Sequence, residues 1–406
     1  MNERERPEAV GQCAAVVLGG YVNGYSIICE LRERGVKPIW LLDNNRSLAS
    51  FSRRIDGFLR IGNDPRSLLE ALRKLSSNYR KLVVYPTNDV HLEDLYAIHD
   101  EISAYCFLPY NRDNLLSALD KKTQYDYCDK LNVPHPCSIE LNTPEDIPRL
   151  AALGHPIIIR PRKRDDLRSD VFRNLLLTSV ADIERHATHL TQLLERGVSL
   201  LASEVIPGDD ANIHAYVAYR SASGKILDEW IGRKLNQFPD GFGVFSSASN
   251  EAPEIVRELG RRLVDGMDLH GIVQPEFKFD PRDGKFKLME INLRSMMWHR
   301  LGNRTGVFLQ HAQWMDAQGQ PVERTNRQCT RRIHLVYLKH ECGNLLSRRG
   351  YFRQFTRNLF GGDQRSFVVL DYSDPGPMVR DLLSYFRYMA GALLLRWKRR
   401  ASDTPR

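Results

Sequence analysis

Two short alternating runs joined by a turn-forming segment occupy residues 274–295, which read QPEFKFDPRDGKFKLMEINLRS. Side chains alternate faces along a strand, so the register of a hairpin decides which of them meet. In the register that pairs Glu276 with Glu290, residues 281–285 form the loop, and their Pro, Asp and Gly suit such a turn. A shift by one pair leaves the two glutamates as diagonal neighbours. The segment therefore predicts an antiparallel hairpin with two carboxylates on one face.

The two carboxylates need a compensating charge if that face is covered. Like charges opposite each other on a sheet cost up to about 1 kcal/mol, and more when buried, unless a cation lies between them. Asn292 and Lys278 share the face of Glu276 and Glu290. Two carboxylates and an amide oxygen are hard ligands of the kind that Mg²⁺ accepts together with nucleotide phosphates. The alternative is a solvated outer face on which the pair is merely tolerated.

The sequence around Glu290 resembles a known signature. Residues 289–294, MEINLR, are similar to the Glu-aliphatic-Asn-Pro-Arg segment of the ATP-grasp superfamily, with Leu293 in place of the usual proline. The resemblance implies that ATP is the nucleotide and that Arg294 steadies the transferred phosphoryl group or an acyl-phosphate. It also implies that Mg²⁺, or Mn²⁺ in its place, is held by Glu276, Glu290 and Asn292.

Length and composition are those of a globular protein with more than one domain. The 406 residues are enough for two or three domains, and 42% are hydrophobic and 27% charged. The seven cysteines form no Cys-x-x-Cys pair, which favours reduced thiols in the cytoplasm over disulfides or a zinc site. The polar N-terminus indicates no signal peptide, and the sequence has no run of about 18 apolar residues that would span a membrane.

All of the excess positive charge lies near the C-terminus. Residues 323–406 contain 17 Lys and Arg against 7 Asp and Glu, whereas residues 1–322 contain 41 against 43. We therefore expect an N-terminal parallel-sheet α/β domain at 1–115, a two-subdomain ATP-grasp fold at 116–322, and a basic, helical C-terminal extension at 323–406. The overall fold class is mixed, α/β and α+β.

Residues 14–43 predict a β-loop-α-β unit and hence a parallel sheet. A buried-strand run, AAVVL, is followed by GGYVNG, an amphipathic stretch and a second strand that ends at Asp43. The glycines allow a tight turn, but their spacing is not G-x-G-x-x-G, which argues against a nicotinamide cofactor. A further strand at 81–86 precedes a helix opened by Asn88 and Asp89. The resemblance implies that this domain helps to bind the acceptor substrate.

Residues 119–138, LDKKTQYDYCDKLNVPHPCS, resemble the start of the ATP-grasp domain and imply that Lys121 contacts a phosphate or the adenine side. A surface helix with Lys121 and Lys122 in water is the alternative. Farther on, HPIIIRPRKR has Arg160 where the family has lysine, and arginine can hold a phosphate bidentately but is not equivalent to lysine. The lid loop of the family is often rich in glycine, whereas residues 161–177 contain none.

Residues 200–219, LLASEVIPGDDANIHAYVAY, resemble the hinge strand of the family and the strand that follows it. A plain strand followed by a PGDD turn is the alternative. The resemblance implies nucleotide contacts by the backbone of Val205 and Ile206 at the adenine edge, Glu204 at its amino group, Asp209 or Asp210 at the ribose, and Lys278 on the hairpin.

Residues 230–250 contain a basic pair, Arg233 and Lys234, before a loop with two glycines that let backbone N–H groups face an anion. In ATP-grasp ligases a basic residue here stabilises the acyl-phosphate, and the resemblance assigns that role to Lys234. The alternative is a solvated strand end. His186 and His189 lie on a predicted polar helix with no third ligand near in sequence, which favours a surface position over a metal site.

This order of motifs, over roughly residues 14–310, most resembles carbamoyl-phosphate-synthase-like ATP-grasp proteins described as predicted carboxylate-amine ligases. Such enzymes convert a small-molecule carboxylate into an acyl-phosphate, which an amine then attacks. Positioning and charge neutralisation carry phosphoryl transfer, so a site without a protein nucleophile is expected. One alternative is an ATP-grasp enzyme with a thiol or phosphoryl acceptor. The least favoured alternative is a non-enzymatic protein that binds nucleic acid or a membrane through its basic C-terminal segment, since no RNA-binding signature is present.

Near the C-terminus, RDLLSYFRYMAGALLLRWKRR has apolar residues at helical spacing with basic residues beside them. Basic residues near anionic lipid contribute about 1 kcal/mol each, which gives the hypothesis of an interfacial helix at the inner membrane face. Docking on the protein core or on a second subunit, as in a homodimer, is the alternative. The apolar stripe consists of Leu382, Leu383, Phe386, Met389, Ala390, Leu393, Leu394 and Trp397.

Overall fold

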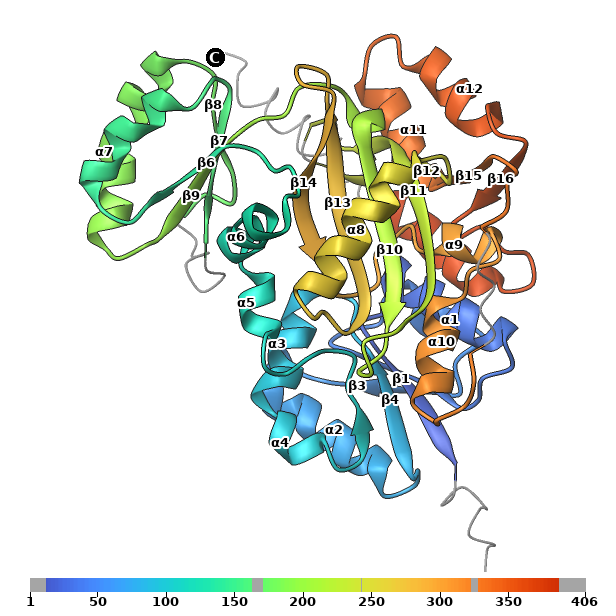
Figure 1. Cartoon of the computed structure of the whole chain (residues 1–406). Coiled ribbons are helices and arrows are strands. Elements are labelled where there is room, and N and C mark those ends of the chain that lie inside the picture. Colours follow the sequence, from blue (N-terminus) through green and yellow to red (C-terminus); the bar gives the residue numbers. More distant parts are fainter. Residues whose placement is uncertain (1–11, 163–170, 242, 323–327, 387–406) are drawn as a thin grey trace, which may run out of the picture.

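The structure is a computed structural model that describes residues 12–162, 171–241, 243–322 and 328–386. Three sheets organise these residues (Figure 1). The first has five parallel strands in the order β3-β2-β1-β4-β5. Its strands are β1 (Cys13–Leu18), β2 (Ile39–Asp43), β3 (Gly57–Arg60), β4 (Lys81–Tyr85) and β5 (Cys106–Phe107), and its helices are α1 (Val22–Glu33), α2 (Pro65–Ser76), α3 (Asp89–Ala97) and α4 (His99–Ile102).

The first β-loop-α-β unit forms as the sequence predicts, because β1 is apolar throughout and the loop that follows it is rich in glycine. All residues of β1 are buried, as expected for a central parallel strand. Gly19 has a φ of +81°, and a Cβ at Gly24 would lie 2.0 Å from the Gly19 carbonyl oxygen, so the turn into α1 requires both glycines. Asn88 caps α3 by accepting from the His91 amide, which confirms the predicted helix start.

The second sheet has four antiparallel strands in the order β6-β9-β7-β8 and lies at the left of Figure 1. Helix α7 (Val180–Glu195) and a 3₁₀ segment at Pro144–Ala152 pack against one of its faces through buried leucines and isoleucines. Helices α5 (Leu115–Leu119) and α6 (Lys121–Leu131) connect it with the first domain. Its strands are β6 (Ser138–Leu141), β7 (Ile157–Pro161), β8 (Leu175–Leu177) and β9 (Leu200–Glu204).

The third sheet has seven strands in the order β14-β13-β10-β11-β12-β15-β16. Helix α8 (Glu254–Gly266) covers one face, and α9 (Arg300–Arg304) and α10 (Leu309–Asp316) follow the hairpin on the side of the N-terminal domain (Figure 1). The strands are β10 (Ile213–Arg220), β11 (Ile226–Phe238), β12 (Val244–Ser249), β13 (Gly271–Asp280), β14 (Lys285–Asn292), β15 (Ile333–Val336) and β16 (Gln364–Phe367).

The basic C-terminal segment is more than a helical extension. Its strands β15 and β16, which the sequence analysis did not predict, continue the third sheet, and α11 (Leu338–Ser347) and α12 (Phe352–Phe360) lie beside them. The chain then returns to the N-terminal domain, where buried Asp374 accepts from the Tyr25 hydroxyl and the Arg53 amide. The domain limits at 115 and 322 remain predictions, and residues 387–406, with most of the predicted apolar stripe, lie outside the described residues.

Among the described residues, no helix has the length and apolar character needed to cross a membrane. All seven cysteines are described, and each is a free thiol.

One buried carboxyl couples the packing of α1 on α9 and α10 to pH. Glu30 accepts from the Asn303 side chain and the His311 amide, and burial raises the pKa of its carboxyl to about 7. In the unfolded chain this carboxyl loses its proton near pH 4.5, whereas in the folded protein it keeps the proton up to about pH 7. The contribution of protonated Glu30 to the free energy of unfolding is therefore lost as the pH rises from about 4.5 to about 7. We expect the loss to approach about 1.4 kcal/mol per pH unit.

We expect Glu30→Gln to remove the part of the pH dependence of stability that arises from Glu30. Urea midpoints at pH 5 and pH 7.5 should differ less in the variant than in the wild type. Equal pH dependence in the two proteins would mean that Glu30 is ionised in the folded state throughout this range.

Candidate active site

The hairpin of β13 and β14 places its two glutamates directly opposite each other. Glu276 pairs with Glu290, and Gln274 pairs with Asn292, which confirms the predicted register at this end of the hairpin. Glu276 is 5% exposed, so the face is not the solvated outer surface of the alternative interpretation. The two carboxylates share one side of the third sheet, where Glu276 is buried and the Glu290 side chain is 39% exposed.

Nearer the turn, a β-bulge changes the register by one residue. Phe277 pairs with Leu288, and Lys278 pairs with Lys287, so Met289 is the extra residue of β14. Lys285 pairs with Asp280 and belongs to the strand, which corrects the predicted loop of 281–285 to 281–284. Bulges strengthen the local twist and redirect side chains. Parity within a strand could not reveal this insertion.

Each glutamate is matched by a lysine from another element. The Lys234 Nζ on β11 lies 2.8 Å from Glu276 Oε1, and the Lys121 Nζ at the first turn of α6 lies 3.0 Å from Glu290 Oε2. Burial raises the pKa of Glu276, whereas Lys121 lowers the pKa of Glu290. Burial also lowers the pKa of Lys121. The four side chains form a charge-balanced cluster that brings together residues 121, 234, 276 and 290.

A buried amide and an imidazole orient Glu276. The Gln274 Nε2 donates to Glu276 Oε2 at 3.2 Å, and Gln274 Oε1 lies 2.7 Å from His299 Nε2. Because that oxygen can only accept, His299 must carry its proton on Nε2. Burial, followed by the charge of Arg294, lowers the pKa of His299 to about 3, which keeps the ring neutral. The sequence analysis identified neither Gln274 nor His299.

Gln237 links Lys234 to the predicted ribose contact. Its backbone and side-chain amides donate to the two oxygens of Asp210 at 2.9 and 2.8 Å, and the Lys234 Nζ lies 3.5 Å from its Oε1. Lys278 is half-buried, and burial lowers its pKa while Asp210 and Asp209 oppose that shift. The structure therefore brings Asp210, Lys278 and Lys234 to the same side of the sheet.

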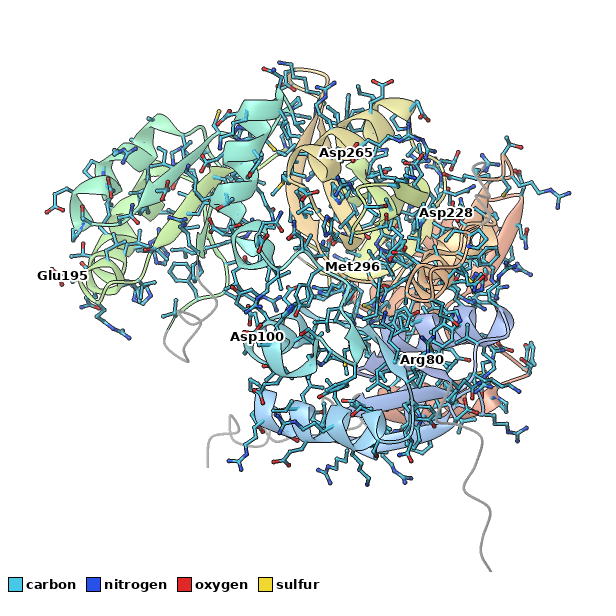
Figure 2. The ribbon with its side chains drawn as sticks, turned by 60° about the horizontal axis from the view of Figure 1, so that its bottom comes forward. Arg80, Asp100, Glu195, Asp228, Asp265 and Met296 are labelled. Atoms are coloured by element: carbon cyan, nitrogen blue, oxygen red, sulfur yellow. The ribbon has the colours of Figure 1, made fainter. Side chains whose placement is uncertain are left out.

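Arg294 follows β14 and reaches the N-terminal domain. Its Nε lies 2.6 Å from Asp89 Oδ1, at the first residue of α3, and a guanidinium nitrogen contacts the Met296 sulfur. Figure 2 labels Met296 near the middle of the molecule, where the N-terminal domain meets the third sheet. Asp89 was predicted only as a helix start, because nothing local in sequence relates it to Arg294.

The four-stranded sheet supplies the opposite side of the site. Arg160 on β7 donates to the Asn174 side chain at 2.9 Å, and its charge contributes to the low pKa of Glu290. The Val205 amide donates to the Pro156 carbonyl, and Ile206 is buried. At the end of β9, Glu204 contacts two basic residues of the hairpin, Arg282 at 2.7 Å and Lys287 at 3.2 Å. These ion pairs join the two sheets.

Lys121 is held in place by its neighbours on α6. Asp120 caps the helix and pairs with Arg162 at 3.0 Å, and Arg162 also pairs with Glu140. Lys122 pairs with Asp126 and Glu140, so neither lysine of the pair is simply solvated. The network fixes the start of α6 against the four-stranded sheet.

Three other residues that the sequence analysis considered lie away from the cluster. Arg233 pairs with Glu251 at 3.3 Å and lines a groove that also includes residues of α8, on the opposite face of the sheet from Lys234. His186 is partly exposed and His189 is exposed on α7, at the surface as predicted. Lys163, three residues after Arg160, lies outside the described residues.

The donor set suits a hard cation. Among the described residues, no group of three or more His, Cys, Asp or Glu is arranged to hold a metal ion. Two opposed carboxylates with an adjacent amide are nevertheless the oxygen ligands that Mg²⁺ takes when phosphates and water complete its shell. Asn292 lies next to the pair, with its Nδ2 3.4 Å from Glu290 Oε1.

Comparison with known proteins finds a relative by sequence and many solved structures with a similar fold. No family model matches the chain. The D-aspartate ligase of Enterococcus faecium (strain Aus0004) is 23% identical over 234 residues, which cover 55% of this chain and 56% of that enzyme. The match therefore spans about half the length of that relative.

Solved structures match a larger share. The ADP complex of an N5-carboxyaminoimidazole ribonucleotide synthetase has a TM-score of 0.62 at 16% identity and covers 86% of each chain. Biotin carboxylase from Campylobacter jejuni has a TM-score of 0.60 at 12% identity, over 76% of this chain and 72% of that one. The chain therefore has the ATP-grasp fold that the motif order predicted, preceded by the expected parallel α/β domain.

Proposed function

We propose that this protein is an ATP-dependent ligase that activates a small-molecule carboxylate as an acyl-phosphate and joins it to an amine. The observation that carries the proposal is the cluster of Glu276, Glu290, Lys234 and Lys121 between the two sheets of an ATP-grasp fold. The name of the sequence relative, D-aspartate ligase, supports the same chemistry. ATP as substrate and the free thiols favour the cytoplasm.

In this proposal some residues of the site bind the nucleotide and its metal ion, and others stabilise the transferred phosphoryl group. Mg²⁺, for which Mn²⁺ can substitute, would be held by Glu276, Glu290 and Asn292, and it would supply positive charge beside the phosphates. When these carboxylates bind a cation, Lys121 and Lys234 become available for phosphate oxygens. The further nucleotide contacts that we propose are Arg160, Glu204, Val205, Ile206, Asp210 and Lys278.

In the proposed reaction, a carboxylate oxygen of the substrate attacks the γ-phosphorus, and the bond between that phosphorus and the ADP oxygen breaks. The amine nitrogen then attacks the acyl carbon, the bond from that carbon to the phosphate oxygen breaks, and the amine loses a proton. Lys234 and Arg294 stabilise the negative charge of the acyl-phosphate, and Asp89 orients Arg294. No step requires a nucleophile from the protein.

The proposal is tested by phosphate release and product analysis. The full chain is incubated with MgATP, D-aspartate or other small carboxylates, and a panel of amines, and the products are analysed by mass spectrometry. We expect phosphate release that requires both partners and a product with an amide bond. A thioester or a phosphorylated acceptor would instead favour the alternative ATP-grasp chemistries. Nucleic-acid binding without ATP turnover would contradict the proposal.

Arg160 provides a test of the nucleotide site. We propose that it performs the phosphate contact that the family gives to lysine, so Arg160→Lys should retain most of the ATP affinity. Arg160→Ala should weaken it about 10- to 100-fold, because a charge-assisted hydrogen bond to phosphate is lost. MgATP titration by calorimetry measures both, with Arg185→Ala on exposed α7 as the control. Wild-type affinity in Arg160→Ala would show that Arg160 has no such role.

We also retain two proposals about assembly. The apolar stripe that begins with Leu382, Leu383 and Phe386, which are 53%, 49% and 60% exposed, would contact the inner membrane face. Alternatively, it would mediate a homodimer. Sedimentation equilibrium of the full chain distinguishes a monomer from a dimer.

A further inference from the structure

Helix α12 (Phe352–Phe360, FRQFTRNLF) buries an asparagine and leaves its two terminal phenylalanines in solvent. The one buried residue of this helix is Asn358, whereas Phe352 and Phe360 are 66% and 63% exposed. A surface helix of a globular protein normally packs its apolar stripe on the core and leaves its polar side in water. Helix α12 departs from this pattern, because Phe352 and Phe360 lie in solvent together with Arg353 and Arg357.

Specific contacts of Asn358 fix the orientation of α12. The Asn358 side chain donates to Asn236 Oδ1 at 2.7 Å and to both oxygens of Glu341, and its carbonyl accepts from His334 at 2.8 Å. Glu341 is 1% exposed and also accepts from the Tyr351 hydroxyl at 3.0 Å. Rotating the helix to bury its phenylalanines would remove the Asn358 side chain from Asn236 and Glu341 and leave Asn236 Oδ1 without this donor, which is costly.

Exposed arginines flank the apolar side chains. Residues 342–362 contain no aspartate or glutamate. Arg349, Arg353 and Arg357 are exposed, and none forms an ion pair with an acidic residue in the part of the chain that the structure describes. Leu346, 69% exposed, precedes them on α11. We call the set of Leu346, Arg349, Phe352, Arg353, Arg357 and Phe360 the α12 surface.

We propose that the α12 surface binds an anionic membrane surface. Phenylalanine and leucine would enter the boundary between headgroups and acyl chains, and the arginines would contact anionic headgroups, which is how interfacial helices bind. Each basic residue near an anionic leaflet contributes about a fivefold factor to binding. A second copy of the chain fits less well, because a twofold interface would oppose the two sets of arginines.

The position of α12 is compatible with catalysis at a membrane. The helix lies beside β15 and β16, at one edge of the third sheet, whereas the glutamate hairpin forms the other edge. Figure 1 shows α12 on the side of the molecule away from the four-stranded sheet. Attachment through α12 would leave the active site open. The proposal is independent of the proposed reaction.

Vesicle sedimentation of the full chain tests the proposal. We expect the wild type to pellet with vesicles of phosphatidylglycerol and phosphatidylcholine at low salt, and much less with phosphatidylcholine alone or at high salt. The double variant Phe352→Asp/Phe360→Asp should bind at least about 10-fold more weakly. Leu116→Asp and Val180→Asp, at exposed apolar positions on α5 and at the first residue of α7, are the matched controls and should bind like the wild type.

A second variant distinguishes loss of the arginine charges from loss of folding. Arg349→Gln/Arg353→Gln/Arg357→Gln removes three exposed charges without placing acidic groups on the helix, and thermal unfolding checks the fold. It should weaken binding to anionic vesicles by about 100-fold and reduce the salt dependence. Wild-type pelleting by both variant sets would overturn the proposal and assign lipid binding to the C-terminal stripe. Absence of pelleting by the wild type, or a dimer abolished by Phe352→Asp/Phe360→Asp, would also overturn it.

Discussion

Glu290→Gln is expected to lower ATP turnover by about 1000-fold while the protein stays folded, because one carboxylate of the opposed pair loses its charge. Glu290 lies directly opposite Glu276, and its oxygens contact Lys121 and Asn292. The amide keeps the shape of the side chain but is a weaker ligand for a divalent cation and a weaker partner for lysine. Steady-state phosphate release with MgATP and the substrates found by screening measures the effect.

The control for Glu290→Gln is the same change at an exposed position. Glu184 is exposed on α7, in the domain of the four-stranded sheet but away from its hairpin contacts, and Glu184→Gln should retain wild-type turnover. Turnover should also stop in excess EDTA. Wild-type activity of Glu290→Gln, or undiminished turnover in EDTA, would remove the carboxylate pair from the reaction.

Lys234→Met is expected to reduce the free energy of unfolding by about 3–5 kcal/mol, because it leaves a buried carboxylate without its cation. The Lys234 and Glu276 side chains are 11% and 6% exposed, so water cannot replace the missing charge. Urea unfolding followed by tryptophan fluorescence measures the loss. The same variant should lose turnover, because Lys234 is the residue proposed to stabilise the acyl-phosphate.

A double variant separates the two effects of Lys234→Met. In Lys234→Met/Glu276→Gln the buried charge is gone as well, so most of the lost stability should return while turnover stays absent. Recovery of turnover with stability would show that Lys234 serves only to neutralise Glu276. Failure of the double variant to recover stability would mean that the cluster is not held by charge compensation.

Local sequence patterns were sufficient to predict much of the active site. Alternation along two strands and a turn of suitable length placed Glu276 and Glu290 on one face, directly opposite or diagonal, and the structure has them directly opposite. The bulge at Met289 was not predicted, because an inserted residue leaves the apolar pattern of a short strand almost unchanged. The family resemblance added Lys121 and Lys234, which lie far from the hairpin in sequence but contact it.

Other features depend on contacts between distant segments. Gln237 lies beyond two irregularities of β11, so its position relative to Lys234 cannot be obtained by counting residues. His299 and Asp89 act on residues of other elements through single polar contacts. Strands β15 and β16 have only four residues each. The sequence analysis interpreted the segment that contains them from its basic charge and did not predict strands there. These residues and strands could be assigned their places only when the order of the strands in the sheets was known.

The most direct test of the account follows oxygen from the carboxylate to the phosphate. A substrate labelled with ¹⁸O in its carboxylate is turned over with MgATP and the amine, and the released phosphate is analysed by mass spectrometry. Formation of an acyl-phosphate requires one carboxylate oxygen to leave with the phosphorus, so the account predicts one ¹⁸O atom in each phosphate. Unlabelled phosphate, with both labelled oxygens retained on the carboxylate-derived product, would contradict it.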